Sequence, residues 1–139
     1  HAGMKACVAA LADLLKKEPA LHLQQFNPEG FAWHDLDHRQ ESVICFRRMT
    51  KNADQELMVV LNMTPRERLE WTVDVTSGDQ WKEIFNSDEK NYWGTGNYVN
   101  NMVISPIIRK NTNSHEIKLS LPPLGGCILK RINPNLNPS

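Results

Sequence analysis

The sequence predicts an all-β domain, an antiparallel β-sandwich preceded by one N-terminal α-helix. Three observations support this prediction. A helical apolar pattern is confined to the first 17 residues, about six short apolar or alternating segments follow from residue 42 onward, and turn residues separate those segments. Because no helical pattern lies between the segments, we expect the strands to pair with antiparallel neighbours in a sandwich or barrel-like β domain.

The N-terminal helix is predicted from apolar residues spaced three and four positions apart, and Pro19 should end it. Its apolar stripe consists of Met4, Cys7, Val8, Leu11, Leu14 and Leu15. A stripe of this kind must lie against another surface. The sequence leaves two partners open, either the rest of this chain or a structure that precedes it in a longer protein.

The predicted strands differ in the faces that they bury. Residues 57–63 form a nearly continuous apolar run, which is expected of a strand buried on both faces. Residues 69–75 alternate, so they predict an outer strand with one apolar and one wet face. The other predicted strands are residues 42–48, 81–85, 117–121 and 127–132, and we expect Trp33, Trp71 and Trp81 in the core.

Length and charge exclude several classes of protein. The 139 residues leave room for one domain but not for a complete α/β-barrel enzyme. Lys and Arg together number 16, as do Asp and Glu, so we expect no electrostatic partner such as a nucleic acid or an anionic membrane surface. No apolar run is long enough to span a membrane. The three cysteines are widely spaced and lack a C-x-x-C pattern, which favours reduced thiols in a cytoplasmic protein.

Catalytic and metal-binding patterns are weak. In the segment HDLDH, His34 and His38 have the spacing of a helical metal-binding pair, but in an extended segment before a strand, alternate side chains point to opposite faces. We expect the acidic pairs to be solvated residues of turns; they are Asp35/Asp37, Glu67/Glu70 and Asp88/Glu89. Gly94-Thr95-Gly96 is interpreted as a turn. We therefore predict no catalytic residue, no metal site and no cofactor.

One segment favours a binding function. Aromatic and amide side chains surround a glycine-bearing loop there, and they are Asn91, Tyr92, Trp93, Asn97, Tyr98, Asn100 and Asn101. Flat rings stack on the apolar faces of pyranose rings and amides bond to hydroxyl groups, so Tyr92, Trp93 and Tyr98 are candidate carbohydrate-binding residues. The alternative is that Tyr92 and Trp93 cover a sheet edge or dock against a neighbouring domain.

Five segments in collinear order over residues 1–132 resemble the C-terminal region of glycogen (1,4-alpha-glucan) branching enzymes, members of the α-amylase superfamily. KEPALH at 17–22 with FNPEGFAW at 26–33 resembles the junction between the last barrel helix and the C-terminal β domain. The other matches are residues 42–48, the apolar strand ending in Asn62-x-Thr64-Pro65, residues 81–88, and LSLPPL at 119–124. The chain departs from the family at His34, usually aliphatic, at Trp93, in a loop normally of Tyr-Gly-Gly-Ser-Gly character, and over residues 98–115.

The resemblance implies a non-catalytic β domain that packs on and stabilises a catalytic barrel. The parent enzyme would transfer α-1,4-glucan segments to 6-hydroxyl groups, forming α-1,6 branches. The family's catalytic carboxylates lie on the barrel, so none is carried over to this chain. Two alternatives remain, a carbohydrate-binding module that holds α-glucan through surface aromatics and the equivalent domain of another α-amylase-type enzyme.

The resemblance also implies a division of the chain. Residues 1–28 would be the final barrel helix and linker, residues 29–132 the β-sandwich, and residues 133–139 a disordered tail. The helix would then face barrel strands that this chain lacks. We therefore expect an exposed apolar row, or a dimer contact, at Met4, Val8, Leu11 and Leu15.

Overall fold

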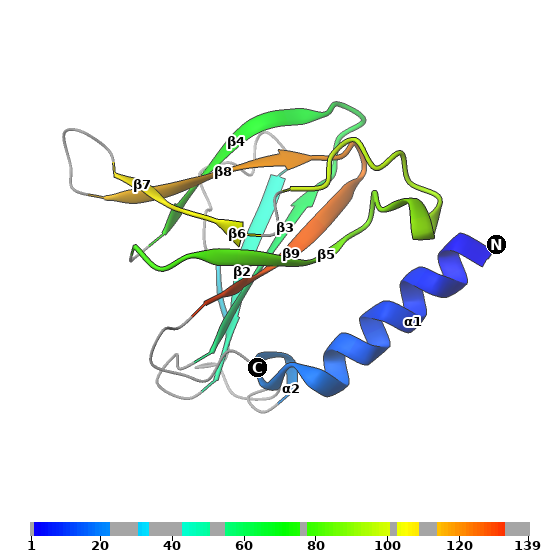
Figure 1. The fold of residues 1–139 in the computed structure, drawn as a ribbon, viewed down its shortest axis with the longest axis horizontal. Helices are drawn as coiled ribbons and strands as arrows, with labels where there is room; N and C mark the ends of the chain where they lie inside the picture. The colour runs from blue at the N-terminus through cyan, green and yellow to red at the C-terminus, as the bar shows by residue number, and fades with distance from the viewer. Residues whose placement is uncertain are drawn as a thin grey trace.

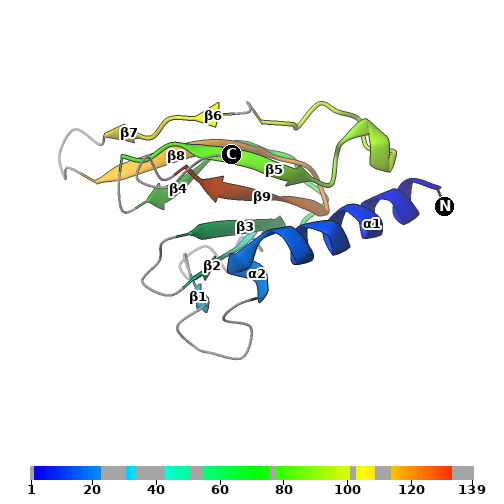
Figure 2. The same ribbon diagram turned by 60° about the horizontal axis from the view of Figure 1, so that its bottom comes forward.

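The computed structural model describes residues 2–22, 31–33, 43–50, 55–75, 78–100, 103–108 and 114–132. These residues form two antiparallel sheets and an N-terminal helical segment, which confirms the predicted fold class (Figures 1 and 2). Within these ranges, no helix is long and apolar enough to cross a membrane. The HDLDH segment at 34–38, residues 23–30 around the predicted domain boundary and the tail at 133–139 lie outside the described residues.

Two helices open the chain, α1 at Ala2–Lys17 and α2 at Pro19–His22. Pro19 cannot continue α1 because it has no N–H, but its fixed φ suits the first position of a new helix. Glu18, between the helices, donates its N–H to the Leu14 carbonyl at 2.9 Å. Its carboxylate pairs with Nζ of Lys130 at 2.9 Å, which ties the helical junction to strand β9 (Gly125–Arg131).

The strands form a six-stranded sheet, with order β1-β2-β3-β9-β5-β6, and a three-stranded sheet, with order β4-β8-β7. The larger sheet consists of β1 (Phe31–Trp33), β2 (Val43–Met49), β3 (Glu56–Asn62), β9, β5 (Trp81–Asn86) and β6 (Val103–Ile104). The smaller one consists of β4 (Arg68–Val75), β8 (His115–Leu121) and β7 (Ile107–Ile108). All pairings are antiparallel. The short strands β1, β6 and β7 were not among the six predicted segments.

The main core lies between the two sheets and draws buried side chains from both. Its members are Val43, Cys45, Met58, Val60, Val73, Val75, Trp81, Ile117, Leu119, Leu121, Cys127 and Leu129. Trp81 is buried in this core as predicted. In β3, Met58 and Val60 face the core, whereas Leu57 and Val59 belong to a second apolar cluster. The prediction that this strand is buried on both faces is therefore confirmed.

The second cluster covers the outer face of the six-stranded sheet. Leu57, Val59, Phe85 and Ile128 form it together with Ala20 of α2. From α1, the half-buried Cys7, Ala10 and Leu14 pack against it. These three residues repeat every three or four positions, so one stripe of α1 lies on this chain and forms a third layer over the sheet.

Strand β4 is an edge strand, as predicted, but its alternation is interrupted. Glu70 has a φ of 56°, and the register with β8 shifts between Arg68 and Trp71. This bulge turns Leu69 to solvent, where 60% of it is exposed, so the prediction that Leu69 lies on the apolar face was wrong. Trp71 packs against the core but stays half-buried, with the Arg68 guanidinium 5.7 Å from its ring centroid. The side chain of Trp33 lies outside the described set.

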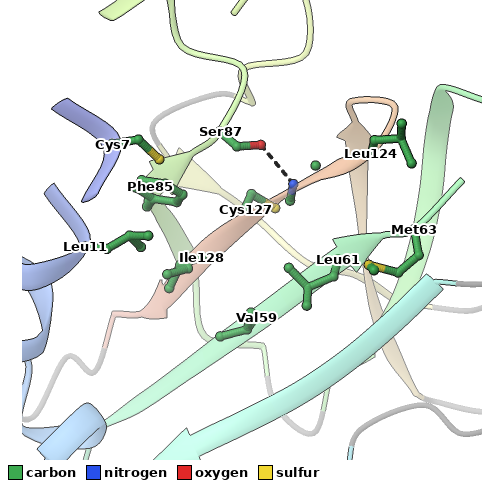
Figure 3. A pocket seen from close by; sticks show the side chains of 12 residues that line it. Cys7, Leu11, Val59, Leu61, Met63, Phe85, Ser87, Leu124, Cys127 and Ile128 are labelled. Atoms are coloured by element: carbon green, nitrogen blue, oxygen red, sulfur yellow. Dashed lines mark hydrogen bonds between the residues drawn. The ribbon is translucent and has the colours of Figure 1, made fainter. Parts of the chain in front are cut away.

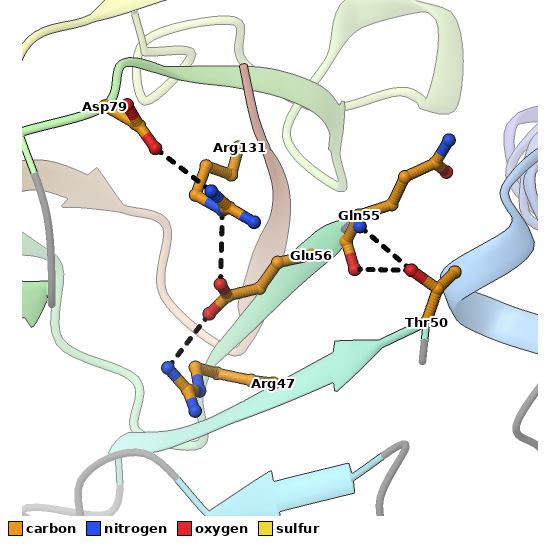
Figure 4. A network of polar contacts seen from close by, with 6 residues as sticks. All are labelled: Arg47, Thr50, Gln55, Glu56, Asp79 and Arg131. Carbon is orange, nitrogen blue, oxygen red and sulfur yellow. Dashed lines mark hydrogen bonds and ion pairs between the residues drawn. The ribbon is translucent and has the colours of Figure 1, made fainter. Parts of the chain in front are cut away.

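A buried carboxylate links three parts of the sandwich (Figure 4). Glu56, at the start of β3, pairs with Arg47 of β2 at 3.0 Å and with Nε of Arg131 of β9 at 3.3 Å. Arg131 also contacts Asp79, before β5, at 3.0 Å. Because burying a charge is costly unless it is paired, the two guanidinium groups explain how Glu56 is accommodated.

Candidate functional site

The loop after β5 carries the predicted binding residues, and Asn86 holds both of its ends. Asn86 is fully buried. Its Nδ2 donates to Glu83 Oε2 at 3.1 Å and to the Tyr98 carbonyl at 3.0 Å, while its Oδ1 accepts the Asp88 N–H at 2.8 Å. The end of β5 and residue 98 are therefore fixed to one another through a single side chain.

Asp88 organises the interior of this loop. Its carboxylate accepts hydrogen bonds from the Thr95 N–H at 2.9 Å, the Thr95 hydroxyl at 2.7 Å and the Tyr98 N–H at 3.2 Å. Burial favours a higher pKa for the Asp88 carboxyl, but the hydrogen bonds from Thr95 and Tyr98 outweigh it and hold the pKa below its ordinary value. The expectation that Asp88 is a solvated turn residue was wrong, since it is buried and serves as the loop's internal acceptor.

Glycines let this loop fold tightly around Asp88. A Cβ at Gly94 would lie 2.1 Å from the Asp88 carbonyl oxygen, so only glycine fits there. Gly96 has a φ of 75°, and its N–H donates to the same carbonyl at 2.8 Å. The interpretation of Gly94-Thr95-Gly96 as a turn is therefore confirmed.

The three candidate aromatic residues have different surroundings. Tyr92 ends the short helix η4 (Lys90–Tyr92), is half-buried, and stacks on Phe85 with ring centroids 5.5 Å apart and planes at 26°. The Tyr98 hydroxyl donates to Glu67, a bond that raises the pKa of Tyr98. Trp93 is 72% exposed and adopts a left-handed backbone with a φ of 68°. Among the three rings, Trp93 alone is largely available to a ligand.

Asn100 belongs to the framework rather than to an open surface. Its N–H and Nδ2 donate to the Glu83 carboxylate at 3.1 and 2.6 Å, and its side chain exchanges hydrogen bonds with the backbone of Ser120 in β8. Burial raises the pKa of Glu83, against the opposing effect of the hydrogen bonds from Asn100 and Asn86. Asn100 thus connects the loop to both sheets, and Asn101 lies outside the described residues.

An apolar groove of about 400 Å³ opens beside α1 on the outer face of the larger sheet (Figure 3). Its floor contains Val59, Phe85 and Ile128, which come from three neighbouring strands. Leu11 of α1 lines one side, and Met63 and Leu124 line the other, with Leu124 70% exposed at a φ of 48°. Leu124 thus combines a strained backbone with an exposed apolar side chain at the rim of an apolar groove, and contiguous exposed apolar surface of this kind is uncommon on soluble proteins.

The predicted apolar stripe of α1 is divided between two faces. Cys7 and Leu14 pack on this chain, whereas the expected exposed row is open, led by Met4 at 71% and Val8 at 60% and continued by Leu11 and Leu15. The helix begins beside η4 in both views (Figures 1 and 2). Contact is so close there that a Cβ at Gly3 would lie 2.7 Å from Trp93 Cγ and 2.8 Å from the Tyr92 carbonyl oxygen.

Other chemistry is sparse in the described ranges. Within them, no group of three or more His, Cys, Asp or Glu side chains is arranged to hold a metal ion. Cys7, Cys45 and Cys127 are not joined in disulfides, and burial raises the pKa of Cys127 well above its ordinary value. Glu67 accepts the Tyr98 hydroxyl, so it is engaged in a contact between two loops.

Comparison with known proteins identifies the fold family. The family model described as "Alpha amylase, C-terminal all-beta domain" matches residues 33–132, which is most of the chain. The chain belongs to this family. The matched range covers the two sheets from the last residue of β1 onward and begins after both helices, so α1 and α2 precede the alpha-amylase C-terminal all-beta domain proper.

Curated relatives extend the similarity through the helical segment. The chain is 37% identical over 130 residues to a 1,4-alpha-glucan branching enzyme of Aquifex aeolicus, covering 94% of this chain and 21% of that protein. Branching enzymes of Photobacterium profundum and Rhodopirellula baltica are 35% and 36% identical, with 93% and 94% of this chain and 18% of each relative covered. The chain therefore spans about a fifth of the length of the curated relatives it matches.

The sequence analysis did not identify two buried amide side chains that hold the loops of this all-beta domain. Asn62 and Asn86 are completely buried and bind backbone groups of distant loops. A signal was present, since each amide ends an apolar strand and is followed by a hydroxyl residue, at Thr64 and Ser87. Ser87 accepts the Gly126 N–H at 3.0 Å and its own N–H donates to the Gly126 carbonyl, which joins β5 to β9.

Proposed function

We propose that this chain is the non-catalytic C-terminal β domain of a 1,4-alpha-glucan branching enzyme. The family match and the names of the relatives support this assignment. The parent enzyme would transfer α-1,4-glucan segments to 6-hydroxyl groups. Buried carboxylates of this chain are engaged structurally, with Glu56 between Arg47 and Arg131 and Asp88 inside its loop, so we propose that catalysis belongs to the rest of the enzyme.

The role of the domain, in this proposal, is to pack on the catalytic barrel and stabilise it. One observation supports this most strongly, which is the apolar face formed by the open row of α1, the groove, and the groove's rim at Met63 and Leu124. We call this the docking face. Soluble proteins seldom leave so many large apolar side chains exposed side by side. Since the relatives are about five times longer than this chain, the proposed occupant is their remaining part, the catalytic barrel.

The two stripes of α1 explain how the helix would contact both the all-beta domain and the catalytic barrel. Cys7, Ala10 and Leu14 hold it on the all-beta domain, and Met4 and Val8 face away from that domain. We propose that α1 is the last helix of the barrel, shared between barrel and sandwich. Docking would then bury its second stripe and fix the orientation of the sandwich at the same time.

A chimera tests the proposed function. In the branching enzyme of Aquifex aeolicus, the segment that aligns with this chain would be replaced by the 139-residue sequence. Branching is followed by the loss of the amylose–iodine colour, with the enzyme lacking that segment as the comparison. We expect the chimera to recover activity that the shortened enzyme lacks. Equal activity of the chimera and the shortened enzyme would overturn the assignment.

We also propose that the protein works in the cytoplasm. Its three cysteines are not joined in disulfides, and Cys45 and Cys127 are buried, as suits a reducing compartment. Fractionation of cells that express the parent enzyme, followed by detection with an antibody against this domain, tests the location. Recovery in the secreted fraction would contradict it.

A further inference from the structure

We propose that Trp93, in the loop after β5, is a stacking platform for one glucosyl ring of an α-glucan chain. The general class of ligand follows from the indole itself, whose flat apolar face complements the C–H-bearing face of a pyranose ring. The choice of α-glucan among carbohydrates rests on the proposed function. Trp93 is the most exposed large apolar residue in the described part of the chain, at 72%.

The backbone holds the indole outward against its own preference. A φ of 68° is rare for a bulky residue and is kept only where the surroundings impose it. Here, the Trp93 N–H donates to the Lys90 carbonyl and the Gly94 N–H to the Glu89 carbonyl, both at 3.0 Å. Strained residues of this kind concentrate at ligand-binding positions.

Neighbouring contacts keep the platform rigid. On one side, Tyr92 is stacked on Phe85, and on the other, the Asp88 carboxylate ties down Thr95. Gly3 of α1 lies against the root of the indole, where a Cβ would come within 2.7 Å of Trp93 Cγ. Because these contacts hold the backbone that carries the indole, less conformational entropy is lost when a ligand stacks on the ring.

The surroundings of Trp93 favour a sugar over a protein partner. From residue 91 to residue 99 every second residue is exposed, and the series is Asn91, Trp93, Thr95, Asn97 and Val99. Two of the exposed residues next to Trp93 in this series are therefore asparagines, whose amides can bond to sugar hydroxyls, whereas the Thr95 hydroxyl is engaged by Asp88. The docking face is different, since its groove is lined almost entirely by apolar side chains. Tyr92 and Tyr98 are occupied by Phe85 and Glu67, so the site reduces to Trp93 and its polar neighbours.

Heteronuclear NMR of the 139-residue chain tests the platform. Maltoheptaose is added to millimolar concentration while the indole N–H signals of the four tryptophans are followed, and cellohexaose serves as the β-linked comparison. We expect the Trp93 signal to shift and to saturate, and the buried Trp81 signal to stay in place. No shift of Trp93, or an equal response to cellohexaose, would overturn the proposal.

Two variants complete the experiment. Trp93→Ala should weaken maltoheptaose binding by about tenfold or more, since it removes the stacking surface. Tyr98→Phe keeps the ring and loses only the bond to Glu67, so it should bind like the parent. Binding that survives Trp93→Ala would overturn the assignment. In the chimera, Trp93→Ala should leave the thermal midpoint unchanged. A chimera that fails to recover activity would count against the proposed function, but it would not affect the result of the maltoheptaose titration.

Discussion

The side-chain amide of Asn62, at the end of β3, donates a 3.0 Å hydrogen bond to the carbonyl of Pro122 in the turn between β8 and β9. The same Nδ2 reaches the Arg66 carbonyl at 2.7 Å, and Oδ1 accepts the N–H and hydroxyl of Thr64. The Thr64 carbonyl in turn accepts the Leu124 N–H at 2.8 Å. One buried amide therefore fastens together two turns, one of which presents Leu124 at the docking face.

Replacing Asn62 should destabilise the domain more than an ordinary amide substitution. Asn62→Ala leaves the carbonyl of the buried Pro122 without its donor and removes one of the two donors to the Arg66 carbonyl, which costs about 1–3 kcal/mol of unfolding free energy. Asn97→Ala removes an exposed amide side chain and should change the free energy by less than about 0.5 kcal/mol. Urea unfolding followed by tryptophan fluorescence measures both, and equal stabilities would contradict the role given to Asn62.

Acid should remove the contribution of the Asp88 carboxylate to the free energy of unfolding. Its pKa in the folded chain lies below the ordinary value of 3.8, so folding favours the ionised form. That stability is present above the ordinary value and is lost as the pH falls through the lowered pKa. Asp88→Asn should therefore be destabilising at neutral pH, and the difference from the parent should shrink below about pH 4. A difference that stays constant on acidification would show that the Asp88 charge plays no part.

The contact between α1 and the loop after β5 should depend on the small size of Gly3. Gly3→Val places methyl groups where the Tyr92 carbonyl and the indole of Trp93 already lie, so the start of α1 must move away. Ala9→Val, at an exposed position of the same helix, isolates the helix-propensity cost of valine, roughly 0.5 kcal/mol. Amide hydrogen exchange should show faster exchange in the first turns of α1 for Gly3→Val alone. Identical exchange in the two variants would refute the close contact.

The open row of α1 should make the isolated chain self-associate. Met4 and Val8 are largely exposed and continue into Leu11 and Leu15, a stripe that a second copy can cover. Static light scattering should therefore report a dimer at high protein concentration. Met4→Gln combined with Val8→Gln should give a monomer, and its unfolding free energy should equal that of the parent at protein concentrations where the parent is also monomeric. A monomeric parent chain would contradict this expectation.

Sequence patterns predicted the elements whose burial is regular along the strand. β3 was recognised because its buried residues from Leu57 to Val60 belong to one continuous apolar run, and β8 because its buried residues alternate. The two-residue strands β6 and β7 leave no periodic signal, since their pairing with β5 and β8 is decided by tertiary contact. Leu69 was predicted on the wrong face of the strand because no residue type in the sequence signals the backbone bulge at Glu70.

The sequence indicates a loop rich in aromatic and amide residues, but it does not indicate which of these side chains are engaged by other parts of the fold. Aromatic and amide residues do gather after β5. Tyr92, however, stacks on Phe85. Tyr98 and Asn100 form hydrogen bonds with Glu67 and Glu83, which lie far from them in the sequence. No local pattern reports which ring will find such a partner. The sequence likewise shows α1 with a single apolar stripe. Only the packing on the sheet distinguishes the half-buried Cys7 and Leu14 from the exposed Met4 and Val8.

The docking face can be tested most directly in the chimera with the Aquifex aeolicus enzyme. Val8→Gln with Leu124→Asn makes two of its exposed residues polar, and Asn suits the left-handed backbone at position 124. Leu69→Gln is the matched control, since Leu69 is equally exposed but lies on the smaller sheet. Neither change should alter the unfolding of the 139-residue chain alone at protein concentrations where that chain is monomeric. We predict that the double variant lowers the thermal midpoint and branching activity of the chimera while Leu69→Gln preserves both, and equal values for the two would contradict docking through this face.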